Sequence, residues 1–365
     1  MWFWWLHAAR GVAACAVVLL HAYWTWPLAF AAPVRNLHLA VDLFFVLSGY
    51  VLCAAFGGTF TRARDIGPFM LRRLGRLLPT LLASGAAWVA ASVLFPASRP
   101  EPVALADAVL RYVSLTDVFF AHPTWRVNPV AWSVMAEVWV YLVFALLFTL
   151  VQNRPLRLLL CMGVSAASLA HVLGAHADLD VVAGGGALVR ALGGFFLGSA
   201  MSLACAADGE ARRVARSRML ALALALAALA LLALQQRYAG IYAALASLVP
   251  LAASLPVPRG RGLGVRALTM LGDASYSLYM WHFLVAVTTA KLLSRLAGQG
   301  VMEFEGERFV LANPVLGTVA LLAYVLVAHG IAVAASRSIE RWRPFMQARA
   351  PKQATAHVGA REAQR

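Results

Sequence analysis

The sequence places an arginine and a histidine eleven positions apart in one apolar run, Arg10 and His21. In an α-helix eleven residues advance by about 1,100° and about 16 Å, so the two side chains share one helical face. An imidazole can act as a general base or a nucleophile near neutral pH. A histidine inside a membrane needs polar partners or a wet cavity, which makes His21 a candidate catalytic residue. The alternative is a structural histidine that only hydrogen-bonds between helices.

A second candidate is a group of three arginines in the stretch FMLRRLGRLLP, namely Arg72, Arg73 and Arg76. Their spacing of i, i+1 and i+4 keeps them close together on a helix. Guanidinium groups bind phosphates through several donors at once, so this patch is suited to an anionic ligand. The same arginines would also stand here if they only marked the cytoplasmic end of a membrane span.

Three further apolar runs carry polar side chains: Asp42 in the first, Ser133, Glu137 and Tyr141 in the second, and Ser275, Tyr279 and His282 in the third. The second and third sets follow helical spacing and predict a polar stripe on one face of each helix. A carboxylate about two turns inside a membrane helix needs an arginine, a histidine or a proton as its partner. Asp42 stands near a helix start, where it either caps the helix or orients a catalytic group.

The composition indicates the elements that must position these residues. The chain of 365 residues is 62% hydrophobic and 13% charged, which predicts an integral membrane protein. We expect an all-α, polytopic helical bundle with about ten transmembrane helices, because each apolar run is long enough to cross about 30 Å of hydrocarbon. The expected spans are 6–26, 39–57, 77–95, 130–151, 157–173, 187–206, 219–236, 239–256, 270–296 and 314–335.

The arginines gather in alternate connections, which by the positive-inside rule places both termini in the cytoplasm. This asymmetry accounts for the net charge of +15 without nucleic-acid binding. We expect a transmembrane domain over residues 1–345 and a basic, disordered cytoplasmic tail over residues 346–365, in a multi-pass protein of the inner (plasma) membrane.

Several other patterns limit the function. No metal site is expected, because the four cysteines lie singly in apolar runs, and no dinucleotide or Walker motif occurs. The segment 95–127 is an outer connection that contains a surface helix, and we expect Gly184–Gly186 to form a flexible loop.

Taken together, the motifs resemble those of the acyltransferase 3 family of membrane acyltransferases over roughly residues 5–345. The similar stretches are RGVAACAVVLLH, AVDLFFVLSG, RRLGRLLP, WSVMAEVWVYL, SYSLYMWH and the terminal SIERWRPF. This chain departs from the family pattern at Val138, where the family has a second glutamate, and at Met135, where it has a serine. We expect no additional soluble esterase-like domain after the membrane region.

The resemblance implies transfer of an acyl group, usually acetyl from acetyl-CoA, to a hydroxyl of a glycan or other sugar-containing acceptor. It assigns catalysis to His21, as general base or acyl relay, with Asp42 or Glu137 orienting the imidazole or pairing with an arginine. The acyl-CoA head would be bound by the arginines Arg10, Arg72, Arg73 and Arg76. The acceptor would be bound by residues of the polar stripes, Ser133, Tyr141, Tyr279 and His282.

An alternative from another class is a transporter or flippase for a lipid-linked or small hydrophobic substrate, with the polar residues forming a proton or substrate path. The absence of a strong internal repeat disfavours it. A third interpretation treats the buried polar residues only as hydrogen bonds between helices. Membrane lipid is the expected surrounding partner, whereas the sequence specifies neither the acceptor nor an oligomeric state.

Overall fold

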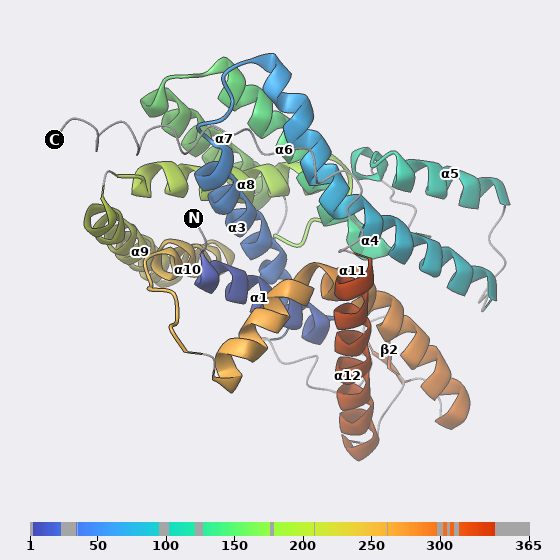
Figure 1. The fold of residues 1–365 in the computed structure, drawn as a ribbon. Helices are drawn as coiled ribbons and strands as arrows, with labels where there is room; N and C mark the ends of the chain where they lie inside the picture. The colour runs from blue at the N-terminus through green and yellow to red at the C-terminus, as the bar shows by residue number, and fades with distance from the viewer. Residues whose placement is uncertain are drawn as a thin grey trace.

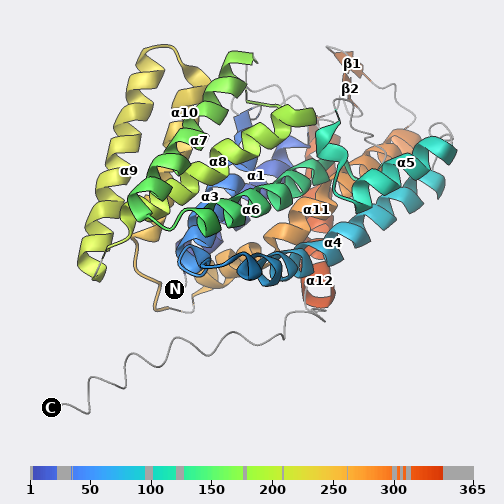
Figure 2. The same ribbon diagram turned by 90° about the horizontal axis from the view of Figure 1, so that it is seen from above.

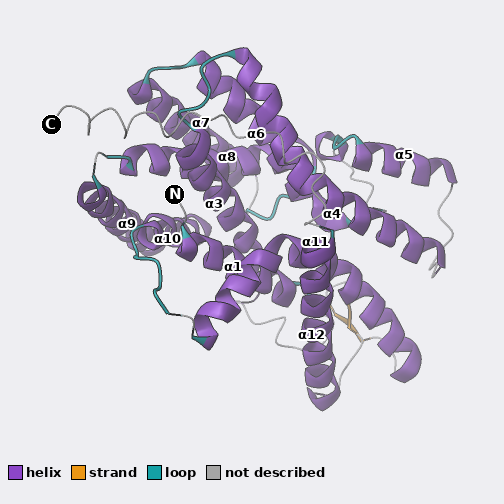
Figure 3. Ribbon diagram, viewed as in Figure 1, coloured by secondary structure: helices purple, strands orange, loops and turns teal. Residues whose placement is uncertain are grey.

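The polypeptide folds into a helical bundle in the computed structural model (Figures 1 and 3). The structure describes residues 3–22, 34, 36–94, 102–120, 127–175, 179–207, 209–260, 262–297, 302–304, 307–309 and 314–339. The helices are α1 (Trp4–Leu20), α3 (Leu39–Phe56), α4 (Ile66–Leu94), α5 (Pro102–Val113), α6 (Trp132–Leu150), α7 (Arg154–Ala175), α8 (Gly184–Cys205), α9 (Glu210–Ala233), α10 (Arg237–Ala253), α11 (Leu263–Ala297) and α12 (Pro314–Ser338). Two short strands, β1 (Met302–Phe304) and β2 (Glu307–Phe309), pair in antiparallel register.

The all-helical class expected from the sequence is confirmed. Within the described ranges, seven helices are long and apolar enough to cross a membrane: α3, α4, α6, α7, α8, α9 and α12. The helices α1 and α10 are apolar but shorter, with 17 residues each. Helix α11 has 35 residues and spans about 52 Å. Each of the ten expected spans therefore coincides with a helix, while the number of crossings and the side of each terminus stay predictions.

The centre of the bundle is the contact between α3 and α8, where glycines leave no side chain between the two backbones. A Cβ atom on Gly49 would lie 1.8 Å from the carbonyl oxygen of Phe195, and one on Gly198 would lie 2.0 Å from that of Val46. Small residues at these positions allow the two backbones to touch, as is common between membrane helices. This contact fixes the axial position of α8 relative to α3.

Helix α1 packs along α11, which also carries α12 (Figure 1). A buried apolar cluster joins the three helices and includes Ala14, Leu278, Tyr324 and Ala328. Its polar atom is satisfied, since the Tyr324 hydroxyl donates to the carbonyl of Val18 at 3.2 Å. Through this packing the C-terminal end of α1 comes to rest beside the middle of α11.

A cluster of aromatic rings packs edge to face where α6 ends and α4 begins. Phe60, Phe69, Phe144 and Phe195 have ring centroids 5.1–6.1 Å apart in the pairs that touch. The cluster supports the first turns of α4, which carry the arginine group. Helices α9 and α10 form a hairpin at the opposite edge of the bundle from α5 (Figure 2).

Two local expectations can be compared with the structure. The helix expected in the outer connection is present as α5. The expected loop at Gly184–Gly186 is wrong, because these glycines form the first turn of α8, with Gly184 at a φ of +61°. The tail 346–365 and the motif residues after Ile339 lie outside the described residues.

Candidate functional site

A cavity of about 520 Å³ opens where α1 ends and α3, α6 and α8 begin. We call it the histidine cavity. Its wall combines aromatic, polar and aliphatic side chains, among them His21, His38, Trp88, Trp132, Asp180, Arg190, Tyr279 and Phe283. A cavity of this size with a few convergent polar groups is typical of a small-molecule site.

The helix end of α1 positions His21 on this wall, since His21 is the C-cap residue of that helix. Its Nδ1 atom lies 3.0 Å from the carbonyl oxygen of Val17 and 3.2 Å from Nε2 of His282. The ring also packs edge to face on Phe283, with centroids 4.9 Å apart. The structure therefore brings His21 and His282, far apart in sequence, into direct contact.

His282 lies behind His21 and is completely buried. Its Nδ1 atom faces two backbone carbonyls of its own helix, those of Tyr279 at 2.6 Å and Leu278 at 3.2 Å. From the sequence, His282 is expected to line the acceptor side. In the structure it contacts the His21 ring and does not belong to the described wall of the histidine cavity.

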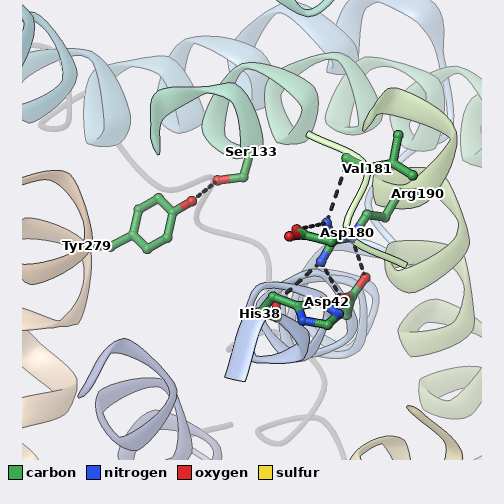
Figure 4. A network of polar contacts seen from close by, with 7 residues as sticks. All are labelled: His38, Asp42, Ser133, Asp180, Val181, Arg190 and Tyr279. Atoms are coloured by element: carbon green, nitrogen blue, oxygen red, sulfur yellow. Dashed lines mark hydrogen bonds and ion pairs between the residues drawn. The ribbon is translucent and has the colours of Figure 1, made fainter. Parts of the chain in front are cut away.

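Asp42 faces Arg190 (Figure 4) and forms an ion pair with it. The guanidinium donates from Nε to Asp42 Oδ1 at 3.0 Å and from Nη2 to Oδ2 at 2.7 Å, and both side chains are buried. The same group lies 3.5 Å from Asp180 and donates to the carbonyls of His38 and Val181, each at 3.3 Å. The bidentate pair ties the first turns of α3 to those of α8 beside the cavity.

Tyr279 separates the histidine cavity from a second space of about 40 Å³, which we call the arginine cavity. The Tyr279 hydroxyl donates to the carbonyl of Val130 at 2.9 Å and shares a hydrogen bond of 2.8 Å with Ser133 (Figure 4). Tyr279 and Val41 line both cavities. The wall between them is thus a single layer of side chains.

The arginine cavity is lined by polar residues from four helices, namely Arg10, Ser48, Ser133, Glu137, Ser275 and Tyr279, together with apolar neighbours. It brings Arg10 of the first motif together with Glu137 of the fourth. Both groups also act electrostatically on Arg73, as does Arg76. Two residues of the arginine cavity, Arg10 and Glu137, therefore lie within electrostatic range of Arg73, while Tyr279 also lines this cavity.

Arg72, Arg73 and Arg76 are half-buried on α4. The guanidinium of Arg73 lies 5.0 Å from the centroid of the Phe56 ring, and that of Arg72 lies 5.8 Å from it. The Nε atoms of Arg72 and Arg73 are buried and have no hydrogen-bond partner in the described part of the chain. Nor does any described carboxylate form an ion pair with the three arginines. Such donors suit an external anion.

The remaining predicted site residue, Tyr141, is buried between the rings of Phe69 and Phe195 and lines neither cavity. Sequence reasoning missed several wall residues, of which Arg190 and Trp132 are the most prominent. The guanidinium of Arg190 lies 5.4 Å from the centroid of the Trp132 ring. A charged residue inside the expected span 187–206 was the signal that could have found Arg190.

In the described ranges, no group of three or more His, Cys, Asp or Glu side chains is placed to hold a metal ion. Comparison with known proteins gives a family match over most of the chain. A family described as an acyltransferase domain, of the acyltransferase 3 type, matches residues 3–335. A curated protein named "Protein 2 in picA locus", from Rhizobium radiobacter, is 34% identical over 125 residues. That match covers 33% of this chain and 60% of the relative. No solved structure matches the chain.

Proposed function

The chain belongs to the acyltransferase 3 family, and on this premise we propose that it moves an acyl group from acyl-CoA to a hydroxyl of a glycan or other sugar-containing acceptor. We propose acetyl-CoA as the donor and the inner (plasma) membrane as the location. One observation carries the proposal: an imidazole, His21, stands on the wall of a 520 Å³ cavity, one layer of side chains from a cavity lined by Arg10. A base that faces the acceptor space, one layer of side chains from the donor space, is what such a transfer needs.

On the donor side, Arg72, Arg73 and Arg76, with Arg10, would hold the phosphates of CoA. Two features support this assignment. The buried Nε donors of Arg72 and Arg73 have no described partner, and the arginines lie on the side of the expected cytoplasm, where acyl-CoA is available. The thioester would then reach towards Tyr279 through the arginine cavity.

At the junction, His21 would remove the proton from the acceptor hydroxyl as the oxygen attacks the thioester carbonyl. A C–O bond forms, the C–S bond breaks, and the imidazolium returns its proton to the leaving thiolate. A relay in which His21 first carries the acyl group uses the same contacts. Both routes require the acyl carbonyl to come close to His21.

The acceptor would occupy the histidine cavity. Its wall includes the indole rings of Trp132 and Trp88, which would pack against the apolar face of a sugar ring, and polar groups such as Asp180 for hydroxyls. A sugar acceptor fits this mixture of aromatic and hydrogen-bonding groups. These contacts support the choice of acceptor class and leave its identity open.

The two cavities must communicate during transfer, and Tyr279 is the residue that separates them. Its hydroxyl is held by Val130 and Ser133 through two hydrogen bonds. We propose that Tyr279 and Ser133 act as a wall that yields when the thioester enters. Glu137, on the arginine side, would balance the charge of Arg10 and Arg73, while Asp42 would anchor α3 to α8 through Arg190.

The proposal is tested by measuring free thiol released from acetyl-CoA by the detergent-purified protein, with and without the saccharide fraction of the source cells' envelope. We expect thiol release that depends on the saccharide fraction and falls by about 10²–10⁴-fold in His21→Ala. The matched control is His171→Ala, since His171 is exposed on α7 away from both cavities. A wild-type protein that releases no thiol, as a transporter would behave, contradicts the proposal.

A further inference from the structure

The contact between the His21 and His282 rings also constrains which nitrogen of each ring carries the hydrogen. The rings have centroids 5.0 Å apart and an interplanar angle of 53°, with His282 Nε2 pointing at His21 Nδ1 over 3.2 Å. Two neutral imidazoles can form this hydrogen bond only if one nitrogen donates and the other accepts. The surrounding backbone determines which nitrogen does each.

The backbone of its own helix determines which nitrogen of His282 donates. Its Nδ1 faces the carbonyl oxygens of Tyr279 and Leu278. Carbonyl oxygens accept hydrogen bonds and never donate them, so Nδ1 carries the hydrogen. A neutral imidazole has a single N–H group, and Nε2 of His282 is therefore an acceptor.

The position of the hydrogen on His21 follows in the same way. Its Nδ1 faces two acceptors, the carbonyl oxygen of Val17 and Nε2 of His282. Nδ1 of His21 must therefore carry the hydrogen, and the lone pair of the ring is on Nε2. No described residue forms a hydrogen bond with this Nε2, and the ring lines the histidine cavity. The basic nitrogen is left for a ligand in that cavity.

We propose that His282 is a positioning residue that holds His21 in the Nδ1–H tautomer and presents Nε2 as the base. This inference rests on the proposed acyl transfer, which it deepens. The acceptor proton moves to His21 Nε2, the C–O bond forms, the C–S bond breaks, and the thiolate takes that proton. His282 gains and loses no proton, but its bond from His21 Nδ1 becomes charge-assisted while His21 is an imidazolium.

A neutral partner suits a buried site in a membrane protein. A carboxylate in the place of His282 would orient the ring equally well, but it would put a charge into an environment where ions are unfavourable. The nearby carboxylate of Asp42 is already bound by Arg190 through both oxygens. His282 is hydrogen-bonded both to the backbone of α11 and to His21, so it orients the His21 ring without adding a net charge.

The direct test is ¹⁵N NMR of the full-length protein in detergent, labelled at its 9 histidines. The His21 signals are assigned from their loss in His21→Gln. We expect a protonated Nδ1 and an unprotonated Nε2 for neutral His21 in the wild type. A His21 with its hydrogen on Nε2 overturns the inference. This readout needs no activity, so it is independent of whether acyl transfer itself is found.

Kinetics test the positioning role. His282→Leu keeps a side chain of similar size but removes the acceptor, and we expect kcat for thiol release to fall on the order of 10²-fold with little change in KM for the acceptor. His282→Gln places a carboxamide oxygen near the position of Nε2 and should recover activity to within about tenfold of the wild type. In His282→Leu the Val17 carbonyl is the remaining acceptor at Nδ1, so the His21 spectrum should show a smaller share of the Nδ1–H tautomer than in the wild type.

The matched control is His329→Leu. The Nδ1 atom of His329 also faces a carbonyl of its own helix, that of Val325 at 2.8 Å, but its Nε2 contacts Cys15 and no cavity residue. We expect wild-type activity from this variant. Full kcat with an unchanged His21 tautomer in His282→Leu would overturn the inference. If that variant does not fold, a His282→Gln protein with mixed His21 tautomers overturns it equally.

Discussion

Among single residues, Asp42 and Arg190 show how a buried charge is satisfied in this protein. Each side chain is almost completely buried and the two form a bidentate pair. Removing one partner of such a pair leaves an uncompensated charge, which typically destabilises a protein by about 3–5 kcal/mol, whereas replacing both by apolar residues is much better tolerated.

A double-mutant cycle tests this role. We expect Asp42→Leu and Arg190→Met to lower thermal stability in detergent strongly as single changes, and the double variant to regain much of the loss. The pair of Asp107 and Arg111, whose side chains are 44% and 24% exposed, is the control, because an ion pair in contact with solvent contributes only about 0–1 kcal/mol. Additive losses in the buried pair would contradict a structural anchor.

A second prediction at the scale of residues concerns the arginine group. Arg73→Gln should weaken binding of acetyl-CoA by about 10–100-fold, since hydrogen bonds to charged groups contribute about 1.5–3 kcal/mol each. Isothermal titration with acetyl-CoA measures the change. The control is Arg64→Gln, an exposed arginine before α4; equal weakening by both variants would point to a general charge effect.

At the scale of elements, the close contact of α3 and α8 positions both halves of the Asp42–Arg190 pair. Gly198→Ala would force a Cβ atom to within 2.0 Å of the Val46 carbonyl oxygen, so the helices must separate. We expect a loss of at least about 1–3 kcal/mol in stability, as for other overpacked cores. Thermal unfolding monitored by circular dichroism in detergent measures it.

Gly163→Ala on α7 is the matched control for that change, because its Cβ would meet no atom within 4 Å. Alanine is also favoured over glycine inside a helix by about 1 kcal/mol. The control should therefore be neutral or slightly stabilising. If Gly198→Ala behaved like Gly163→Ala, the close approach of α3 and α8 would not be essential for the fold.

The helices themselves were predictable from sequence, because long apolar runs have few alternatives in a membrane. The helical conformation of the triple glycine at the start of α8 was not, since glycine-rich segments usually form turns, whereas these residues form the first turn of the helix. At the site, spacing predicted that Arg10 and His21 share a face. The partner of Asp42 was not predictable, because Arg190 is 148 residues away in the sequence.

At the scale of the whole molecule, the motifs from separate helices converge on two adjoining cavities. His21 comes from α1, Tyr279 and His282 from α11, and Ser133 from α6. From the sequence, His21 is expected to have polar partners or to line a wet cavity. The structure has a large and a small cavity with Tyr279 between them, a division that depends on side-chain packing and carries no sequence signal.

We propose that His21 catalyses transfer from a donor on one side of the membrane to an acceptor on the other. Proteoliposomes with ¹⁴C-acetyl-CoA only on the side of the arginine group, and the envelope saccharide fraction only on the opposite side, test it directly. We predict label in the saccharide for the wild type and for His171→Ala, and none above background for His21→Ala. Equal labelling by His21→Ala, or none by the wild type, would contradict the account.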